Sequence, residues 1–293
     1  MSTADFLQVM ARGSHERAVA ARRELSEAAL LARVQAAPPA PPLLRGAGGF
    51  DLIAELKLRS PAAGQLRAAD QEDPARRALI YAQAGAAAVS VLTEPSRFDG
   101  SLEHLSAASD ALRGHRVPTM RKDFLVDPYQ VLEARAAGAG GVLIILRMLS
   151  RPQLDQLCAA VKAHGMFALL EAFDEADIDL AHDLLDAHGD SHADANGGRA
   201  RAAPVQWLVG VNCRDLSTLQ VVPGRLEALA RLLSTQVPRV AESGVATAED
   251  ARRVAAAGYD LALVGSALMS GTDPGALAHE MIVAGRRARQ QWY

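Results

Sequence analysis

The chain has 293 residues, is 49% hydrophobic and has a formal net charge of −3. The net charge is small and the sequence has no long basic run, so a nucleic acid partner is not expected. Apolar runs have the length of strands rather than of membrane spans. Charged residues throughout 1–34 argue against a secretory signal. Because the two cysteines, Cys158 and Cys213, lack metal or redox spacing, we expect a reduced, cytoplasmic setting.

The N-terminal part predicts a helical extension. Residues 3–34 have the pattern of an amphipathic helix, with an interruption expected near Gly13. An Ala/Pro/Gly-rich linker follows at 35–49. We therefore expect an extension with its linker over 1–48 and a catalytic domain over 49–293.

The catalytic domain alternates short apolar runs with helical segments rich in Ala, Leu and Arg. Eight such pairs over about 240 residues predict an α/β fold, the (β/α)8 TIM barrel. The alternative is a doubly wound open sheet. That fold usually has a Gly-rich dinucleotide turn after its first strand, and LKLRSPAAG is not one. The eight runs begin near Leu52, Val89, Pro118, Gly141, Phe167, Trp207, Arg239 and Leu261.

The clearest β-α-β unit spans 118–146. Its first strand is predicted at Pro118–Phe124, and Asp127-Pro128 predicts a helix start with Asp as the N-cap. Gly138 predicts the end of that helix. The first strand ends on Arg121-Lys122-Asp123, and three adjacent charges at a strand end indicate a site.

One segment interrupts this alternation. Residues 187–204 are polar and Gly-rich, which predicts a flexible surface insertion. His188 and His192 could suggest a metal site, although the composition favours a solvated loop. Since the segment precedes the sixth strand, we expect it at the end of the barrel opposite the active site.

Lysine is rare in this chain. The 31 Lys plus Arg include only Lys57, Lys122 and Lys162, and the first two stand at predicted strand ends. A buried lysine can lose its proton near neutral pH, whereas arginine cannot. This placement indicates proton chemistry. The alternative is a lysine whose stem lies on the strand end while its amine reaches solvent.

Other strand ends carry further candidates. Glu55 lies two residues before Lys57, so the two side chains should share one side of the strand. Glu171 lies within an apolar run, where burial favours its neutral form and a nearby cation opposes this. Such a carboxyl group suits general acid–base catalysis. A structural ion pair is the alternative. The sixth strand ends with Asn212 and Arg214, again two apart.

The last two strands indicate phosphate binding. The seventh ends on Glu242-Ser243-Gly244 and the eighth on Gly265-Ser266. Small residues that expose backbone N–H groups at these two loops form the usual phosphate site of this barrel. Two ordinary tight turns would give the same pattern.

Taken in order, these motifs resemble those of indole-3-glycerol phosphate synthase. The resemblance covers nearly the whole barrel, and the helical segment before the first strand is similar to one in that family. The motifs are IAELKLRSPAAG (53–64), SVLTEPSRFDGSLEHL (90–105), RKDFLVDPYQVLEARAAGA (121–139), LLEAFDEAD (169–177), VGVNCRDLSTLQV (209–221) and VAESGVATAEDARRVAAAGYDLALVGSALM (240–269).

The resemblance implies a reaction and its catalysts. The family converts 1-(2-carboxyphenylamino)-1-deoxyribulose 5-phosphate to indole-3-glycerol phosphate with loss of CO2 and water, using no cofactor or metal. Lys122 would then be the general acid at the substrate carbonyl oxygen, and Glu171 the group that handles a proton during dehydration. Lys57 would hold the carboxylate of the anthranilate ring and join in proton transfer. The residues that would orient these groups are Glu55, Asn212 and Arg214.

The same resemblance implies how the substrate binds. Phe98 and Phe124 would wall the anthranilate ring, and Ser243 would lie beside the site. We also expect Lys122 to sit among basic neighbours that lower its pKa. The expected ligand is a phosphorylated small molecule, bound by a monomer or weak homodimer. The phosphate-binding positions would be Ser60, Gly244, Gly265 and Ser266.

Two other functions remain open from the sequence. A phosphoribosyl-anthranilate isomerase would share the barrel and the phosphate site but would not need Lys57, Lys122 and Glu171 together. A barrel that binds the phosphorylated ligand without turnover would be a regulatory or scaffolding subunit. A turnover assay distinguishes these alternatives.

Deleting 187–204 should leave kcat and KM nearly unchanged, because the insertion is expected far from the site. Steady-state kinetics of the deletion variant, with circular dichroism to check folding, measure this. A loss of several orders of magnitude in a folded variant would contradict the expected location.

Overall fold

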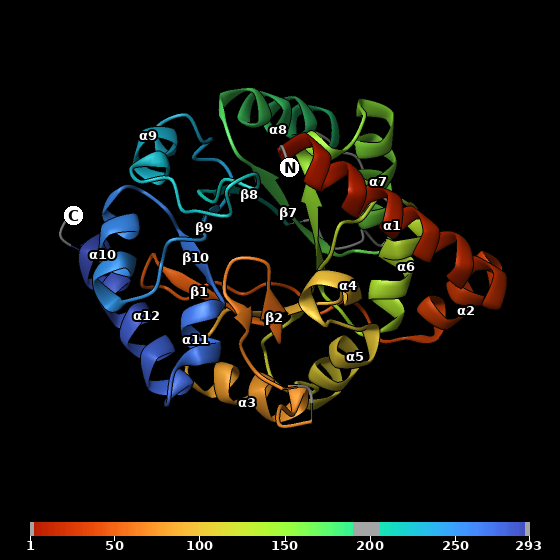
Figure 1. Ribbon diagram of the computed structural model, residues 1–293, viewed down its shortest axis with the longest axis horizontal. Coiled ribbons are helices and arrows are strands. Elements are labelled where there is room, and N and C mark those ends of the chain that lie inside the picture. The colour runs from red at the N-terminus through yellow and green to blue at the C-terminus, as the bar shows by residue number, and fades with distance from the viewer. Residues whose placement is uncertain (1–2, 69, 190–205, 291–293) are drawn as a thin grey trace, which may run out of the picture.

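The computed structural model describes residues 3–68, 70–189 and 206–290, and its centre is a closed barrel of eight parallel strands (Figure 1). The strands follow chain order around the barrel, and pairing of the first with the last closes it. Each strand begins within one residue of its expected start, which confirms the (β/α)8 fold. The strands are β1 Asp51–Leu56, β4 Ala88–Leu92, β5 Thr119–Lys122, β6 Gly141–Ile145, β7 Phe167–Ala172, β8 Trp207–Asn212, β9 Arg239–Glu242 and β10 Leu261–Val264.

Helices surround the strands in Figure 1. A short antiparallel hairpin, β2 (Arg59–Ser60) with β3 (Gly64–Gln65), lies in the loop after β1. The helices after the extension are α3 Pro74–Gln83, α4 Pro95–Phe98, α5 Leu102–Ala111, α6 Pro128–Ala136, the 3-10 turn η1 Leu146–Met148, α7 Arg151–Ala163, α8 Glu175–His188, α9 Arg225–Ala230, α10 Ala248–Ala256, α11 Ser266–Ser270 and α12 Pro274–Gln290.

The barrel interior is filled by side chains from alternate strand positions. Apolar residues such as Ile53, Met120 and Leu169 form an inner cluster, distinct from the larger cluster between strands and helices. Gly141 makes room for the Phe167 ring, since a Cβ there would lie 2.3 Å from it. Because the interior is packed, open space for a ligand remains at the carboxyl ends of the strands.

The N-terminal extension forms two helices, α1 (Thr3–Glu24) and α2 (Glu27–Ala36). The expected interruption at Gly13 is wrong, because α1 runs through it unbroken. A single glycine weakens a helix by only about 1 kcal/mol relative to alanine, which packing can offset. The helix breaks instead before Ser26, whose side chain accepts a hydrogen bond from Ala29 N and so caps α2.

The β5–α6 unit has the predicted cap. Asp127 is the N-cap of α6, Pro128 occupies the first turn, and Gln130 completes a capping box. Gly138 follows the helix with φ +90°, a left-handed conformation that favours glycine. The strand ends at Lys122, before the expected Phe124, because the Phe124 N–H donates a hydrogen bond to the Asp123 carboxylate at 2.8 Å instead of to a neighbouring strand.

The insertion expected at 187–204 lies largely outside the described residues. Helix α8 extends to His188, and the chain is described again from Gln206, just before β8. The Gln206 side chain holds the backbone N and O of Leu43, each at 2.9 Å, at the amino end of the barrel. In the described part of the chain, every helix is too short or too polar to cross a membrane.

The extension is fastened to α6 by several polar contacts. Arg22 donates to both carboxylate oxygens of Asp127, at 2.6 and 3.1 Å, and stacks 4.9 Å from the Tyr129 ring. The fully buried Gln130 side chain donates to Ser14 Oγ at 2.8 Å. These contacts fix α1 beside the strand end that carries Lys122.

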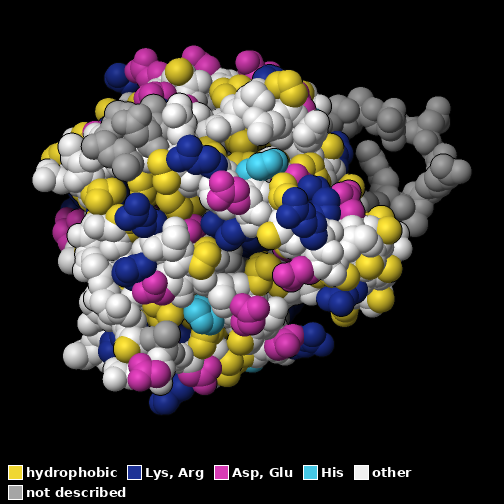
Figure 2. Space-filling view, turned by 45° about the vertical axis from the view of Figure 1, so that its right-hand side comes forward, with side chains coloured by type: hydrophobic (Ala, Val, Ile, Leu, Met, Phe, Trp, Pro, Cys, Tyr) yellow, Lys and Arg dark blue, Asp and Glu magenta, His cyan; other side chains and the backbone are white. Residues whose placement is uncertain are grey.

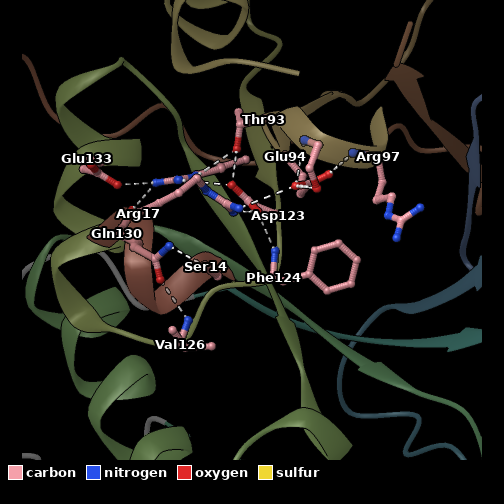
Figure 3. A network of polar contacts seen from close by, with 12 residues as sticks. Ser14, Arg17, Thr93, Glu94, Arg97, Asp123, Phe124, Val126, Gln130 and Glu133 are labelled. Carbon is pink, nitrogen blue, oxygen red and sulfur yellow. Dashed lines mark hydrogen bonds and ion pairs between the residues drawn. The ribbon is translucent and has the colours of Figure 1, made fainter. Parts of the chain in front are cut away.

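Arg17 extends this attachment to two buried carboxylates (Figure 3). Its guanidinium lies 2.7 Å from Asp123 and 3.5 Å from Glu94. Asp123 also accepts hydrogen bonds from Thr93 at 2.8 Å and Arg121 at 3.2 Å. The ends of β4 and β5 are thus joined to α1 through one buried network.

Arg17→Met should lower the free energy of unfolding by about 1–3 kcal/mol, because Asp123 loses one cation while it remains buried. Urea unfolding at neutral pH measures this. Arg23→Met, in the last turn of the same helix, is the control. Equal stability of the two variants would contradict a structural role for the network.

Candidate active site

A cavity of about 300 Å³ opens at the carboxyl ends of the strands. On the face shown in Figure 2, acidic, basic and apolar side chains are interspersed. Every site residue expected from the sequence lines the cavity. They come from seven of the eight strand ends or the loops that follow, and they are Glu55, Lys57, Ser60, Phe98, Lys122, Phe124, Glu171, Asn212, Arg214, Ser243, Gly244, Gly265 and Ser266.

Lys122 lies at the centre of a cluster of carboxyl groups. Its Nζ is 3.2 Å from Glu171 Oε2 and 3.7 Å from Glu242 Oε2. Glu171 is 2% exposed, which confirms that its side chain is buried, and its other oxygen accepts from Asn212 Nδ2 at 3.3 Å. The amine and the carboxylate are therefore within hydrogen-bond distance for proton transfer.

The expectation of a lowered Lys122 pKa is wrong. Burial acts to lower this pKa, but the negative charges of Glu171, Glu242 and Glu55 act more strongly in the other direction and raise it. Arg121, the basic residue adjacent in sequence, does not line the cavity, because its side chain donates to Thr93 and to the backbone of Gln130. Lys122 is consequently held as an ammonium.

A second ion pair occupies the end of β1. Lys57 Nζ lies 2.6 Å from Glu55 Oε1, which confirms that the two side chains share one side of the strand. Gly265 on the neighbouring loop leaves space for them, since a Cβ there would lie 2.1 Å from Glu55 Oε1 and 2.9 Å from Lys57 Nζ. Part of the reason for this glycine is therefore steric.

Glu242 is a site residue that the sequence reasoning did not select. Both of its carboxyl oxygens are buried and lack a hydrogen-bond partner within the described residues. Burial and the nearby Glu171 carboxylate raise the pKa of Glu242 well above its usual range, while Lys122 acts in the opposite direction. The alternation of side chains along a strand could have indicated this residue, because Glu242 is two residues after the inward-facing Val240 on β9.

Gly210 on β8 provides the space for this carboxyl group. A Cβ at Gly210 would lie 2.2 Å from Glu242 Oε1 and 3.0 Å from the Leu169 side chain. Any larger residue would displace Glu242 from its position beside Lys122.

One end of the cavity is aromatic. The Phe98 and Phe124 rings lie 6.2 Å apart, and Phe6 of α1 packs edge-on against Phe124 at 5.9 Å. Phe6 also lines the cavity, and the sequence reasoning missed it. Its signal is weak, since an apolar residue on an amphipathic helix is usually explained by packing alone.

The opposite end is formed by small residues of three loops. Ser60 comes from the β2–β3 hairpin, Ser243 and Gly244 follow β9, and Gly265 and Ser266 follow β10. Ser243 and Gly244 both have positive φ, of 65° and 71°. This end combines backbone amides and hydroxyls with little side-chain bulk, which suits an oxyanion.

Arg214 follows β8 and organises the loop beside it. Its backbone N donates to Asn212 Oδ1 at 3.0 Å, and its guanidinium donates to Leu219 O at 2.5 Å. Leu219 has φ +62°, an uncommon conformation for a side chain of this size. The loop thereby presents Leu216, Leu219 and Val221 to the cavity.

Comparison with known proteins agrees with this arrangement. A family model described as indole-3-glycerol phosphate synthase matches residues 12–188 and 200–281. The chain belongs to the indole-3-glycerol phosphate synthase family. Members of this family are carbon–carbon lyases of tryptophan biosynthesis that release CO2 from their substrate.

Several proteins named indole-3-glycerol phosphate synthase are similar over most of the chain. One from Parafrankia sp. (strain EAN1pec) is 44% identical over 90% of this chain and 90% of its own length. One from Mycolicibacterium gilvum (strain PYR-GCK) is 37% identical over 97% of this chain and 96% of its own.

Similarity to solved structures extends beyond this family and concerns the fold alone. N-(5'-phosphoribosyl)anthranilate isomerase from Pyrococcus furiosus has a TM-score of 0.53 at 12% identity, covering 81% of this chain and 99% of its own. Thiamine phosphate pyrophosphorylase from the same organism has a TM-score of 0.55 at 16% identity, covering 82% and 98%.

Glu242→Gln should become more stable relative to the wild type as pH rises. The folded-state pKa of Glu242 is raised, so above the unfolded value near 4.3 the folded protein binds a proton that the unfolded chain releases. This proton uptake destabilises the wild type progressively until the pH reaches the folded pKa, by at most about 1.4 kcal/mol per pH unit. A neutral amide has no such dependence.

Urea unfolding of both proteins between pH 5 and pH 8 measures the difference. Glu249→Gln, at an exposed carboxylate of α10, is the control. Parallel stability curves for wild type and Glu242→Gln would contradict a raised pKa at this position.

Proposed function

We propose that this cavity closes the indole ring of 1-(2-carboxyphenylamino)-1-deoxyribulose 5-phosphate, with Lys122 as general acid and Glu171 as general base. The observation that supports these roles best is the Lys122–Glu171 contact of 3.2 Å at the buried end of the cavity. An ammonium and a carboxylate at this distance place a proton donor and a proton acceptor beside the reacting atoms of one bound substrate.

The two ends of the cavity define the direction of the substrate. The anthranilate ring lies against Phe98 and Phe124, where flat apolar surface is available. The phosphate lies at the opposite end, bound by Ser60, Gly244, Gly265 and Ser266 with Ser243 beside it. Fixing both ends holds the carbonyl carbon beside the aromatic carbon that attacks it, which provides part of the rate acceleration.

Ring closure requires a proton at the carbonyl oxygen. The aryl carbon that bears the carboxylate attacks the ketone carbon, and the oxygen takes a proton from Lys122 to become a hydroxyl group. Loss of CO2 then returns an electron pair to the ring and restores its aromaticity. The raised pKa of Lys122 ensures that the proton is present when substrate binds.

Dehydration completes the reaction. Glu171 accepts the proton that must leave as the second double bond of the indole forms, and the hydroxyl group takes a proton from Lys122, recharged after the first step, and departs as water. Lys122, left as a neutral amine after the first step, can be recharged by the Glu242 carboxyl group 3.7 Å away, whose raised pKa favours a bound proton. Asn212 orients Glu171, since it already donates to that carboxylate.

Lys57 holds the carboxylate of the anthranilate ring until CO2 leaves. Its ammonium is partly exposed to the cavity and is oriented by Glu55 at 2.6 Å. Arg214 orients the ribulose hydroxyl groups from the loop after β8. The reaction uses no cofactor or metal, and the enzyme acts in the cytoplasm as a monomer or weak homodimer without a nucleic acid or membrane partner.

The reaction is tested by mixing the purified protein with this substrate in EDTA and following indole fluorescence. A metal-independent rise in fluorescence supports the proposal. Saturable binding of the substrate without fluorescence would contradict turnover and would leave a phosphate-ligand barrel. Conversion of N-(5'-phosphoribosyl)anthranilate instead would indicate an isomerase.

Lys122→Met should reduce kcat by about 100- to 10,000-fold, the contribution of a positioned general acid, with substrate binding largely retained. Glu171→Gln should likewise lose most of kcat. Stopped-flow fluorescence with independent measurement of the substrate Kd separates the two parameters. Lys162→Met, on α7 and outside the cavity, is the matched control. Near-normal turnover by Lys122→Met would remove this residue from the general-acid role.

A further inference from the structure

The loop after β1 carries a hairpin that forms one wall of the cavity. Arg59 pairs with Gln65 and Ser60 with Gly64, and the backbone N–H groups of Leu66 and Arg67 close its base on Leu58 O at 2.8 and 3.0 Å. Ser60, Pro61 and Ala62 of this hairpin line the cavity. The position of the hairpin therefore decides how far Ser60 lies from the opposite wall.

Arg67 connects the base of the hairpin to that opposite wall. Its Nε donates to Met269 O at 2.8 Å and its Nη2 donates to Gly271 O at 3.2 Å. Both carbonyls belong to the end of α11 or the residue after it, and the start of the same helix presents Gly265, Ser266 and Ala267 to the cavity. More than 200 residues of sequence separate Arg67 from these partners.

The two hydrogen bonds fix orientation as well as distance. A planar guanidinium with two acceptors cannot rotate without breaking one bond, whereas a lysine ammonium provides a point charge without this constraint. Arg67 is half-buried and forms no ion pair with a carboxylate of the described residues. Its contacts with the carbonyls of Met269 and Gly271 are therefore its principal side-chain interactions in this part of the chain.

We propose that Arg67 is a positioning residue for the substrate phosphate. It holds the Ser60 hairpin and helix α11 at the separation that a phosphate group requires between them. This inference rests on the proposed function, which assigns the phosphate to this end of the cavity. Without Arg67, the hairpin and α11 must be ordered when the ligand binds, and that ordering reduces affinity.

The opposite edge of the hairpin provides a matched control. Arg59 donates to Ser96 O at 2.8 Å and lies 2.9 Å from Asp99, on the side of the cavity that carries Phe98. Arg59 and Arg67 thus fasten the same hairpin to the aromatic end and the phosphate end, respectively. Removal of Arg59 leaves the link to α11 intact.

The test measures inorganic phosphate as a competitive inhibitor of each full-length variant, together with KM and kcat. Arg67→Met should weaken phosphate inhibition and raise KM by about tenfold, while kcat stays within about threefold, because ordering affects binding more than chemistry. Arg59→Met should leave the inhibition constant for phosphate within about twofold of wild type.

Arg67→Lys separates position from charge and also tests the inference if Arg67→Met does not fold. It keeps the positive charge but not the paired geometry, so phosphate inhibition should remain weakened. Hydrogen exchange of the amides in 266–271 should also be faster in both Arg67 variants and unchanged in Arg59→Met.

Three outcomes would overturn the inference. These are unchanged phosphate inhibition in Arg67→Met, full recovery in Arg67→Lys, and equal weakening in Arg59→Met. Absence of competitive phosphate inhibition in the wild type would instead remove the phosphate site of the proposed function, and with it the basis of this inference.

Discussion

The structure of the site depends on one constraint, the placement of two partly buried ammonium groups among three buried carboxyl groups. Lys57 and Lys122 face Glu55, Glu171 and Glu242 at the end of an otherwise apolar barrel interior. With all five groups ionised, the cluster would have one excess negative charge. Burial and the neighbouring Glu171 carboxylate raise the pKa of Glu242, which favours its neutral form and reduces this excess, whereas Lys122 at 3.7 Å acts in the opposite direction.

The same constraint explains two glycines, Gly265 and Gly210, whose roles are not evident from the sequence motifs. Gly265 resembles a phosphate-binding position, yet a side chain there would collide with Glu55. Gly210 lies within a central strand, where glycine weakens packing, and its absent side chain leaves room for Glu242. Charged groups and glycines on neighbouring strands are therefore interdependent, and a change in one requires a change in the other.

Sequence pattern predicted the barrel and most of the cavity, because both follow from local periodicity. Alternation places Glu55 with Lys57 on one side of β1, and the parallel order of strands brings all carboxyl ends together. The pKa of Lys122 was mispredicted because it depends on which side chains cross the barrel. Arg121 precedes Lys122 in sequence but points outward, whereas Glu242 is far away in sequence and points toward it.

Contacts between distant segments could not be predicted from the sequence, because they too depend on which side chains meet in the folded barrel. Arg17 with Asp123 and Arg67 with Met269 join residues about 100 and 200 positions apart, and no local pattern indicates such partners. Gly13 was given too much weight because its intrinsic helix propensity was considered without the packing of α1. A buried face of a helix can offset an unfavourable residue of that size.

That buried face also shows why the extension cannot be separated from the site. Phe6, Met10, Ser14 and Arg17 are spaced by four, four and three residues, so they lie along one side of α1. Phe6 contacts the aromatic wall at one end of this row, and Arg17 holds the carboxylate next to Lys122 at the other. A boundary near residue 48 divides the chain by sequence pattern, but the cavity wall crosses it. A rotation of α1 that moved Arg17 from Asp123 would also move Phe6 from Phe124, so the buried polar network at the end of β5 and the shape of the aromatic end depend on the same helix.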